Sequence, residues 1–441
     1  MLERLFHVSA HHTTVRTEVL AGLTTFLTMA YIIFVQPAVL GRAGMDVGAV
    51  LVATCLASAL ATLLMGLLAN YPIGVAPAMG HNFFFAFTVC LGMNVPWQTA
   101  LGAVAVAGAL FVVTAGFGLR EHLITAIPDS LKHAIAVGIG LLVAFIGLQW
   151  SGLIIASPGT LVTLGDLGSP AALLSLFGLL VIGILWTRGV PGALPLGILA
   201  STAAGLAAGL VQYHGVISAP PSLRPTLFRL DVAAAFAPPM IPVIFVFFFL
   251  ALFDSVGTLV GVANQAGLMR DGTLPRARRA LLADALGTVA GAALGTSTVT
   301  AYIESSTGVA AGGRTGLANM VTAALFLLSL LFFPLVRMIG GGYSTGTEST
   351  LYPVVAPALV LVGTMMMNGV RAIKWEDPTE AIPAFLTIIM MPLSVSITDG
   401  IAFGFIAYAV LKIGTGRRGE AHWLVLLFAA LFVVRYAWLA R

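Results

Sequence analysis

Long apolar segments alternate with short polar stretches along all 441 residues of the chain. An α-helix needs about 17–25 mostly apolar residues to cross the hydrocarbon core of a bilayer. Segments of that length are expected at roughly 19–40, 49–69, 98–118, 133–150, 171–187, 191–211, 242–266, 315–336, 353–370 and 380–397. Shorter or interrupted segments lie at roughly 73–91, 280–296, 298–312, 398–412 and 421–438. The pattern therefore predicts an all-α polytopic membrane protein with about 14 or 15 segments.

Two of the interrupted segments carry helix-breaking residues at corresponding places in the chain. The first, Tyr71–Phe83, contains two prolines and two glycines, and the second, Gly295–Gly308, combines glycines with a cluster of hydroxyl side chains. Each is the third segment of its half, counted from the N-terminus and from about residue 240. Because an odd number of segments per half gives the halves opposite orientations, we expect a seven-plus-seven inverted repeat with a central site at the breaks.

The local sequence predicts how the chain is broken at these two places. The β-branched run Thr298–Ile303 is typical of extended chain, and the Ser, Thr and Gly residues after it favour the start of a half-helix. Asn82 is placed to cap the half-helix that follows the first break, to contact a ligand, or to do both. Non-helical backbone at membrane depth is tolerated only where it is buried in protein or lines a cavity, so the breaks indicate a functional site.

Charge is sparse, and its distribution indicates how the chain is oriented. Charged residues make up 9% and hydrophobic residues 59% of the sequence, whereas a soluble domain has about 25% charged residues. The net charge of +4 arises in short loops, so we interpret it as positive-inside orientation with a cytoplasmic N-terminus and not as nucleic-acid binding. The expected cytoplasmic residues are Arg120, Lys132, Arg188, Arg270, Arg276, Arg278, Arg279, Arg371, Lys374, Lys412, Arg417 and Arg418. The expected external residues are chiefly Arg42, Arg224, Arg229 and Arg337.

Motifs for cofactor or metal chemistry are missing from the sequence. Cys55 and Cys90 lie inside apolar runs, where we expect them to pack and not to form a disulfide or a metal site. There is no Walker sequence, HExxH or CxxC, so ATP-driven transport, a metal and a cofactor have no support. The first apolar run continues to Leu40 without a cleavage pattern, which favours a spanning helix over a removed signal peptide.

Three acidic residues stand in or beside apolar segments. Placing Glu304 near the bilayer midplane costs about 2.5 kcal/mol or more, so it requires a partner, water or a ligand. No Lys or Arg lies in the neighbouring apolar runs, which favours a ligand. Asp254 lies twelve residues into its own apolar run. It either binds neighbouring hydroxyls or, as a second carboxylate close to Glu304, holds a proton when the two negative charges approach each other. Asp284 lies nearer the cytoplasmic side, where a bond to broken backbone and a role in proton transfer both remain open.

Several blocks of sequence resemble the AzgA-like branch of the nucleobase:cation symporter-2 family. The match covers nearly the whole chain, and the combination of blocks makes it specific. The blocks are Thr14–Tyr31, Ser130–Gly138, Phe253–Asn264, Leu274–Thr288, the Glu304 segment, Glu380–Phe385 and Asp399–Gly404.

This resemblance implies a uracil-permease-like fold of fourteen helices in two inverted repeats, with two half-helices and short extended segments at the midplane. A core domain would comprise residues 1–125 and 239–342, and a gate domain residues 126–238 and 343–441. It further implies proton-coupled uptake of purine nucleobases, most often hypoxanthine, guanine or adenine, by alternating access. The protein would be a multi-pass protein of the cytoplasmic (inner) membrane, and a homodimer formed through the gate domain is compatible with the resemblance.

The resemblance also implies roles for the polar residues at the breaks. Asp254 and Glu304 would be the substrate-binding carboxylates, Asn82 a polar partner on the opposing half-helix, and Asp284 a supporting or proton-linked acid. Because purines carry N–H donors beside acceptor atoms, carboxylates suit their donor edge. Hydroxyls near the breaks would serve the acceptor edge: Thr258, Thr300, Ser305 and Ser306, with Thr298 beside them.

His81 and Phe83 mark where this chain departs from the family pattern. Family members commonly read Ala-Pro-Gly-Met-Gly-Leu-Asn-Ala, whereas from Ala76 this chain reads Ala-Pro-Ala-Met-Gly-His-Asn-Phe. His81 is either a group that takes part in proton coupling or a packed, hydrogen-bonded residue. Phe83 either packs in the core or stacks on a bound purine, as aromatic rings do on bases. The departure leaves the preferred purine open.

Two other classes of function are compatible with parts of the sequence. One is a carrier of the same fold for xanthine or urate, uracil or a small anion, but an anion would require positive charge where this chain has two acids. The other is an intramembrane enzyme that uses Asp254 and Asp284 as an aspartyl pair. These two residues are expected at different depths and lack the usual motif contexts, so we expect a transporter and not an enzyme. Coupling to Na⁺ instead of protons also remains open.

Overall fold

The computed structural model describes residues 2–117, 128–269, 274–344 and 350–439, and two of the basic residues named above, Arg120 and Arg270, lie outside them. Eight helices or helix runs in the described chain are long and apolar enough to cross a membrane. They are Val15–Arg42, Val47–Ala69, Trp97–Gly116, Asp129–Trp150, Pro170–Thr187, Pro238–Gln265, Leu317–Gly340 and Ile397–Gly414. Shorter apolar helices span Met79–Gly92, Ala193–Ala207, Pro378–Ser394 and Trp423–Val434. The predicted all-α polytopic class is confirmed.

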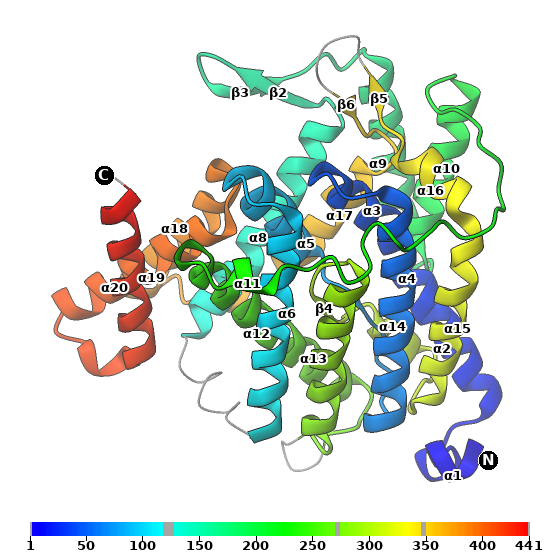
Figure 1. Cartoon of the computed structure of the whole chain (residues 1–441), viewed down its shortest axis with the longest axis horizontal. Helices are drawn as coiled ribbons and strands as arrows, with labels where there is room; N and C mark the ends of the chain where they lie inside the picture. The colour runs from blue at the N-terminus through cyan, green and yellow to red at the C-terminus, as the bar shows by residue number, and fades with distance from the viewer. Residues whose placement is uncertain (1, 118–127, 270–273, 345–349, 440–441) are drawn as a thin grey trace. The chain divides into compact units, whose positions relative to one another are not determined.

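The chain divides into two compact units, which are described separately: Met1–Phe117 with Gln149–Ala358, and Gly118–Leu148 with Leu359–Arg441. The helices of the first unit are α1 (Leu2–Phe6), α2 (Val15–Met29), α3 (Ile32–Arg42), α4 (Val47–Leu64), α5 (Met79–Phe83), α6 (Trp97–Phe117), α9 (Pro170–Thr187), α10 (Ala193–Ala207), α11 (Val232–Ala235), α12 (Ile241–Gln265), α13 (Ala277–Leu294), α14 (Ser305–Ala310), α15 (Leu317–Leu328) and α16 (Phe333–Gly340) (Figure 1). Wider π-helical turns continue α4 through Met65–Ala69 and α5 through Phe84–Gly92.

The described part of the first unit also contains three short antiparallel strand pairs. They are β1 (Val75–Pro77) with β4 (Val299–Ala301), β2 (Ile154–Ser157) with β3 (Leu161–Leu164), and β5 (Tyr343–Ser344) with β6 (Thr350–Leu351). The β2–β3 and β5–β6 pairs are local hairpins. The β1–β4 pair instead joins the two predicted breaks, which are more than two hundred residues apart in the sequence.

The β1–β4 ladder is fully buried and extends beyond its strands. Val75 pairs with Ala301, Ala76 with Thr300 and Pro77 with Val299. At one end the Ala78 backbone N–H donates to the Thr298 carbonyl over 2.9 Å, and at the other the Tyr302 N–H donates to the Gly74 carbonyl over 2.9 Å. Buried backbone groups must find partners, and each break satisfies those of the other. The extended segment and the half-helix predicted after it, now α14, are both confirmed.

Matching threonines hold the two strands in the same way. Thr62 of α4 donates to the Val75 carbonyl over 2.9 Å and accepts from the Val75 N–H over 3.0 Å. Thr288 of α13 donates to the Val299 carbonyl over 2.7 Å and accepts from the Val299 N–H over 3.3 Å. The two helices are the second segments of the two predicted halves. The repeated contact is what an inverted repeat predicts, because equivalent residues then make equivalent bonds.

The second break begins at a glycine that the backbone requires. Helix α13 ends at Gly295, whose φ is +101°, a left-handed conformation that residues with a Cβ rarely adopt. An added Cβ there would also collide with the side chain of Thr226. The turn redirects the chain into β4, so this glycine positions everything that follows it in the break.

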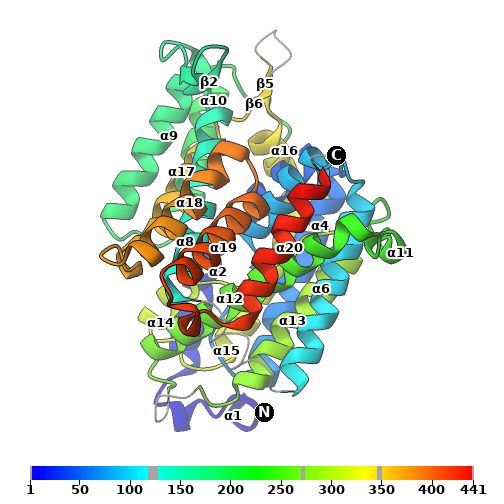
Figure 2. The same cartoon turned by 90° about the vertical axis from the view of Figure 1, so that its left-hand side faces the viewer.

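The second unit contains most of α8 (Asp129–Trp150) and α17 (Ala356–Met366), together with α18 (Pro378–Ser394), α19 (Ile397–Gly414) and α20 (Trp423–Leu439). Helix α19 packs against both α18 and α20 (Figure 2). One apolar core of this unit is formed by Ala134, Val137, Ile373, Ala384 and Ile388. The segment predicted at 421–438 is a helix, α20, and its stretch Trp423–Val434 is apolar.

Candidate substrate-binding site at the helix breaks

Glu304 stands at the entrance of half-helix α14, directly after the extended strand. Its side chain is half-buried, and Oε1 accepts a hydrogen bond of 2.7 Å from the phenolic hydroxyl of Tyr31. Its backbone carbonyl accepts from the hydroxyls of Thr28, at 3.3 Å, and Thr307, at 2.7 Å. The positive end of a helix dipole favours an anionic group at this position. The predicted carboxylate therefore lies at the break and is held by a residue of the first spanning segment.

Asp254 projects from the middle of α12 and is held from the second break. Its side chain is exposed in the protein, and Oδ2 accepts a hydrogen bond of 3.1 Å from the hydroxyl of Thr300 in β4. Thr258 lies one helical turn further along α12 and is buried. The strand β4 thus connects Asp254, through Thr300, to Glu304 four residues later.

Asp284 is fully buried in α13, where the hydroxyl of Ser255 donates to its Oδ2 atom. Ser255 follows Asp254 on α12, so this helix carries one acid and the hydroxyl partner of the other. The predicted alternatives were a bond to broken backbone and a proton-linked role. In the structure, Asp284 has the Ser255 hydroxyl as a side-chain partner, and its carboxylate also has a hydrogen-bond interaction with the backbone of Ala301 in β4, within the second break.

The prediction that Asn82 caps a half-helix is wrong. Helix α5 begins at Met79, because Ala78 is still extended and donates its N–H across the ladder to Thr298. Asn82 therefore lies inside the helix, fully buried, and its side-chain N–H donates to Oε1 of Gln36 over 2.6 Å. Asn82 belongs to a polar clamp and not to a helix end.

Gln36 is the centre of this clamp. Its Nε2 atom donates to the hydroxyls of Thr296, at 2.9 Å, and Ser297, at 2.8 Å, while its Oε1 atom accepts from Asn82. One glutamine of α3 thereby joins the helix after the first break to the chain just before the second strand. All four side chains are buried, so the clamp fixes the two breaks against each other.

The remaining predicted residues divide between exposed and buried positions. Ser305 is buried and its hydroxyl accepts from the Gly74 N–H over 2.9 Å, so it ties α14 to the first break. Ser306 is half-buried, and its carbonyl accepts from Nε2 of Gln265 over 3.2 Å. Phe83 is fully buried and stacks on Phe87, with ring centroids 5.5 Å apart. His81 is 3% exposed, and within the described chain neither ring nitrogen has a hydrogen-bond partner.

Three residues contribute to the site through contacts that the sequence analysis did not identify. Tyr31 lies between α2 and α3, where the first spanning segment is interrupted, and Gln36 is a polar residue in an otherwise apolar helix. Tyr302 donates its hydroxyl to the Pro77 carbonyl across the ladder. A polar side chain inside an apolar run was the available signal for Gln36. Nothing local distinguishes either tyrosine from an interfacial aromatic residue.

The electrostatic character of the site is acidic. Among the described residues, no Lys or Arg forms an ion pair with Asp254 or Glu304. Both carboxylates are accessible at least in part, and each accepts one hydrogen bond from a hydroxyl. An ionised carboxylate has about four lone-pair positions, so both retain capacity for N–H donors of a ligand.

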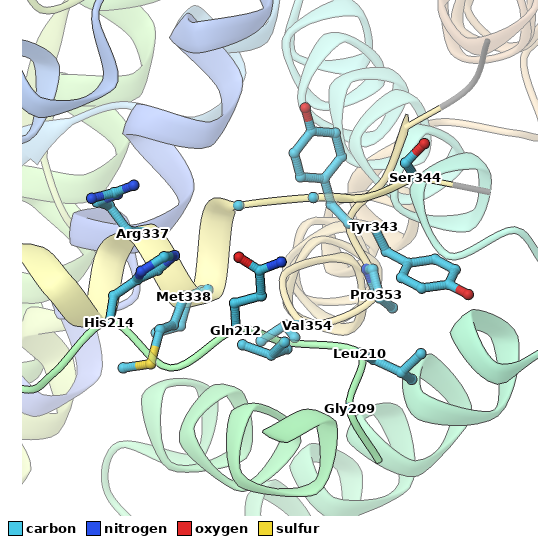
Figure 3. A pocket seen from close by; sticks show the side chains of 15 residues that line it. Gly209, Leu210, Gln212, His214, Arg337, Met338, Tyr343, Ser344, Pro353 and Val354 are labelled. Atoms are coloured by element: carbon cyan, nitrogen blue, oxygen red, sulfur yellow. The ribbon is translucent and has the colours of Figure 1, made fainter. Parts of the chain in front are cut away.

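A separate cavity of about 370 Å³ lies elsewhere in the first unit. It is formed by the chain after α10, the end of α16 and the β5–β6 hairpin, with Arg337, His214, Gln212 and Tyr343 among its lining residues (Figure 3). None of the residues predicted for the substrate site lines it. Its basic side chains, Arg337 and His214, are exposed, which makes it chemically unlike the acidic site at the breaks.

Comparison with known proteins places the whole chain among permeases. A family model described as a permease family (Xan_ur_permease) matches residues 16–403. The adenine permease AdeP of Escherichia coli (strain K12) is 46% identical over 436 residues, which cover 99% of this chain and 96% of that protein. The guanine/hypoxanthine permease PbuG of Bacillus subtilis (strain 168) is 45% identical over 450 residues, covering 99% of this chain and 100% of that protein.

A solved structure confirms the predicted topology. The transmembrane domain of a cyanobacterium bicarbonate transporter, BicA, superimposes with a TM-score of 0.61 at 16% identity, covering 87% of this chain and 97% of that domain. The likeness establishes a seven-plus-seven inverted-repeat fold. With the family match and the apolar helices, the protein is an integral membrane protein. The chain belongs to the nucleobase:cation symporter-2 family of permeases, in its AzgA-like branch.

Proposed function

We propose that this protein is a secondary active transporter that takes up purine nucleobases together with protons. The observation that carries the proposal is the pair of accessible carboxylates at the second break: Asp254, bonded to Thr300 of β4, and Glu304, which follows β4, with no counter-cation among the described residues. Relatives that span the whole chain are adenine and guanine/hypoxanthine permeases, which supports a purine as the substrate. Hypoxanthine and guanine are the leading candidates, followed by adenine.

Purine recognition follows from the donors that the bases carry. A purine presents ring N–H and amino groups beside acceptor atoms, and charge-assisted hydrogen bonds to a carboxylate are about twice as strong as neutral ones. Glu304 and Asp254 would accept the donors. The hydroxyls of Thr258 and Thr300 would complete the polar wall, and Ser306 contributes from α14. Phe83 is buried and stacks on Phe87, so it could stack on a bound purine only if its ring moved away from this position.

Proton coupling follows from the same pair of acids. Two carboxylates that share one site repel each other when both are ionised, and binding a proton to one of them relieves the repulsion. Asp254 is the candidate for that proton because it lies in the middle of α12, whereas Glu304 stands at the start of α14, where the helix dipole favours the ionised form. Asp284 is a supporting acid, linked to the same helix through Ser255. His81, with no partner on its ring nitrogens among the described residues, is a further candidate in the proton path.

The proposal extends to the organisation of the transport cycle. The core domain would comprise 1–125 and 239–342, the gate domain 126–238 and 343–441, and the site would be exposed alternately to the two sides of the cytoplasmic membrane. The N-terminus would be cytoplasmic, and two copies could associate through the gate domain. The protein would change no covalent bond of its substrate and would not be an enzyme.

A carrier for a small anion is the alternative that the fold allows, since BicA has the same fold and is a bicarbonate transporter. At 16% identity this likeness shows the fold alone. An anion would have to approach two carboxylates that no described Lys or Arg neutralises, and like charges repel strongly where water is scarce. The site chemistry therefore favours a neutral base with N–H donors.

Uptake in cells that lack their own purine permeases tests the proposal. Cells expressing the protein should accumulate labelled hypoxanthine, guanine or adenine, and a protonophore should abolish the accumulation. Glu304→Gln should reduce uptake at least about tenfold, because a charged acceptor is lost. Glu376→Gln, at an exposed loop position, is the matched control and should transport normally. Normal uptake by Glu304→Gln would refute the assigned role, and dependence on Na⁺ would refute proton coupling.

A further inference from the structure

Tyr31 is fixed in place by its surroundings. It occupies the interruption between α2 and α3, its side chain is 1% exposed, and its ring lies 6.4 Å from that of Tyr302. Its own carbonyl accepts the backbone N–H groups of Phe34 and Val35 as α3 begins. A side chain with so little freedom loses little conformational entropy on forming its bond to Glu304. The hydroxyl is therefore a permanent feature of the site.

The bond from Tyr31 makes the two oxygens of Glu304 unequal. Oε1 accepts the phenolic proton at 2.7 Å, and among the described residues no other side chain bonds to this carboxylate. Each carboxylate oxygen has two lone pairs, and an oxygen that already accepts one hydrogen bond is a weaker acceptor for a second donor. With one oxygen engaged by a buried ring, Oε2 is the principal acceptor that remains for a ligand.

We propose that Tyr31 determines the donor pattern that the site favours, because its bond to Oε1 leaves Oε2 of Glu304 as the stronger acceptor for one N–H donor from the six-membered ring of a purine. Hypoxanthine offers one donor at that edge, N1–H. Guanine offers two adjacent donors, N1–H and the 2-amino group. Guanine therefore gains little from a second bond to Glu304 in the natural protein. This inference rests on the proposed purine transport, and it names a specificity residue for it.

The test compares apparent KM values for guanine and hypoxanthine in wild type and Tyr31→Phe, normalised to the protein present in the membrane. Wild type should prefer guanine over hypoxanthine by less than about threefold. Removing the phenolic hydroxyl frees Oε1, so the ratio should move toward guanine by about tenfold, the usual effect of one charge-assisted hydrogen bond. Tyr213→Phe removes the phenolic hydroxyl of an exposed tyrosine that is not part of the site, and it should leave the ratio unchanged.

A methylated substrate separates a specificity role from a structural one. 1-Methylguanine keeps the amino group and lacks N1–H, so it cannot make the paired contact. The advantage that guanine gains in Tyr31→Phe should therefore be absent for 1-methylguanine, whereas a general loosening of the site would change both bases alike. An unchanged guanine-to-hypoxanthine ratio in an active Tyr31→Phe protein would overturn the inference.

The inference can also be tested without the variant. If Tyr31→Phe does not reach the membrane, a wild-type preference for guanine over hypoxanthine of more than about tenfold would contradict it, because that preference needs the second charged bond. Failure of the proposed function looks different, since wild type would then take up no purine at all.

Discussion

The hydroxyl of Thr300 donates to Oδ2 of Asp254 over 3.1 Å, so strand β4 of the second break holds the carboxylate that projects from helix α12. Glu304 follows Thr300 by four residues, at the start of α14, and is held by Tyr31. Each carboxylate thus has one hydroxyl donor, and both donors are anchored in buried backbone. The two acids are positioned before any substrate arrives, which reduces the entropy lost on binding.

Asp254→Asn should separate accumulation from exchange. The amide keeps the size of the side chain and a bond to Thr300, but it cannot take up a proton. We expect proton-driven accumulation of purine to fall at least about tenfold, while exchange of internal for external purine persists. Counterflow in proteoliposomes measures both. The exposed acid Asp166 provides the control variant Asp166→Asn, which should resemble wild type. Full accumulation by Asp254→Asn would remove this residue from the coupling mechanism.

Gln36→Leu should destabilise the protein because it removes the hydrogen bonds through which Gln36 joins the two interrupted segments. The substitution leaves the side chains of Asn82, Thr296 and Ser297 buried without this partner. Each buried polar group left unpaired costs about 1–3 kcal/mol, so the loss should total several kcal/mol. A lower midpoint of thermal unfolding in detergent would measure it. Gln212→Leu, at an exposed position, should leave the midpoint unchanged, and equal midpoints for both variants would contradict the clamp.

Lys412→Met should destabilise the second unit. Lys412 is fully buried, and its Nζ atom lies 3.0 Å from Oε1 of Glu380 and 2.8 Å from Oε2 of Glu420. Removing the cation leaves the buried Glu380 without it, and breaking a buried pair in this way costs about 3–5 kcal/mol. The exposed Lys374→Met is the control. Limited proteolysis of this unit should be faster only in Lys412→Met.

The stability of the same unit should fall in acid. A hydrogen bond from the Thr379 hydroxyl, with a further contribution from Arg417, lowers the pKa of Asp377 to about 2. Hydrogen bonds from Arg417 and Lys412 lower the pKa of Glu420 to about 2. Both values lie below the ordinary 3.8 and 4.5. The stabilisation is therefore present above the ordinary pKa and is lost as the pH falls toward 2.

Thermal unfolding at several pH values checks this sign. Arg417→Gln should lower the unfolding midpoint at neutral pH, and the difference from wild type should shrink as the pH falls through 4. A difference that is constant, or that grows in acid, would contradict the assignment of the pKa shifts to these contacts.

The sequence predicted those features that depend on local composition. Apolar length identified the spanning segments, and the β-branched run before Glu304 identified an extended strand followed by a half-helix. Asn82 shows the limit, because its assignment as a cap depended on where α5 begins. That boundary is set by the bond from Ala78 to Thr298, which lies more than two hundred residues away. Tyr31 and Gln36 act through contacts of similar separation, which no local pattern identifies, although a polar side chain inside an apolar run marks Gln36 itself.

Equilibrium binding of labelled hypoxanthine to the purified protein tests the central claim most directly, that the acids at the crossed breaks bind a purine. Guanine and adenine should compete with the label, and bicarbonate should not. Glu304→Gln should weaken binding at least about tenfold, and Glu376→Gln should bind like wild type. Purine binding that is unchanged by Glu304→Gln, or displacement of the label by bicarbonate, would contradict the account.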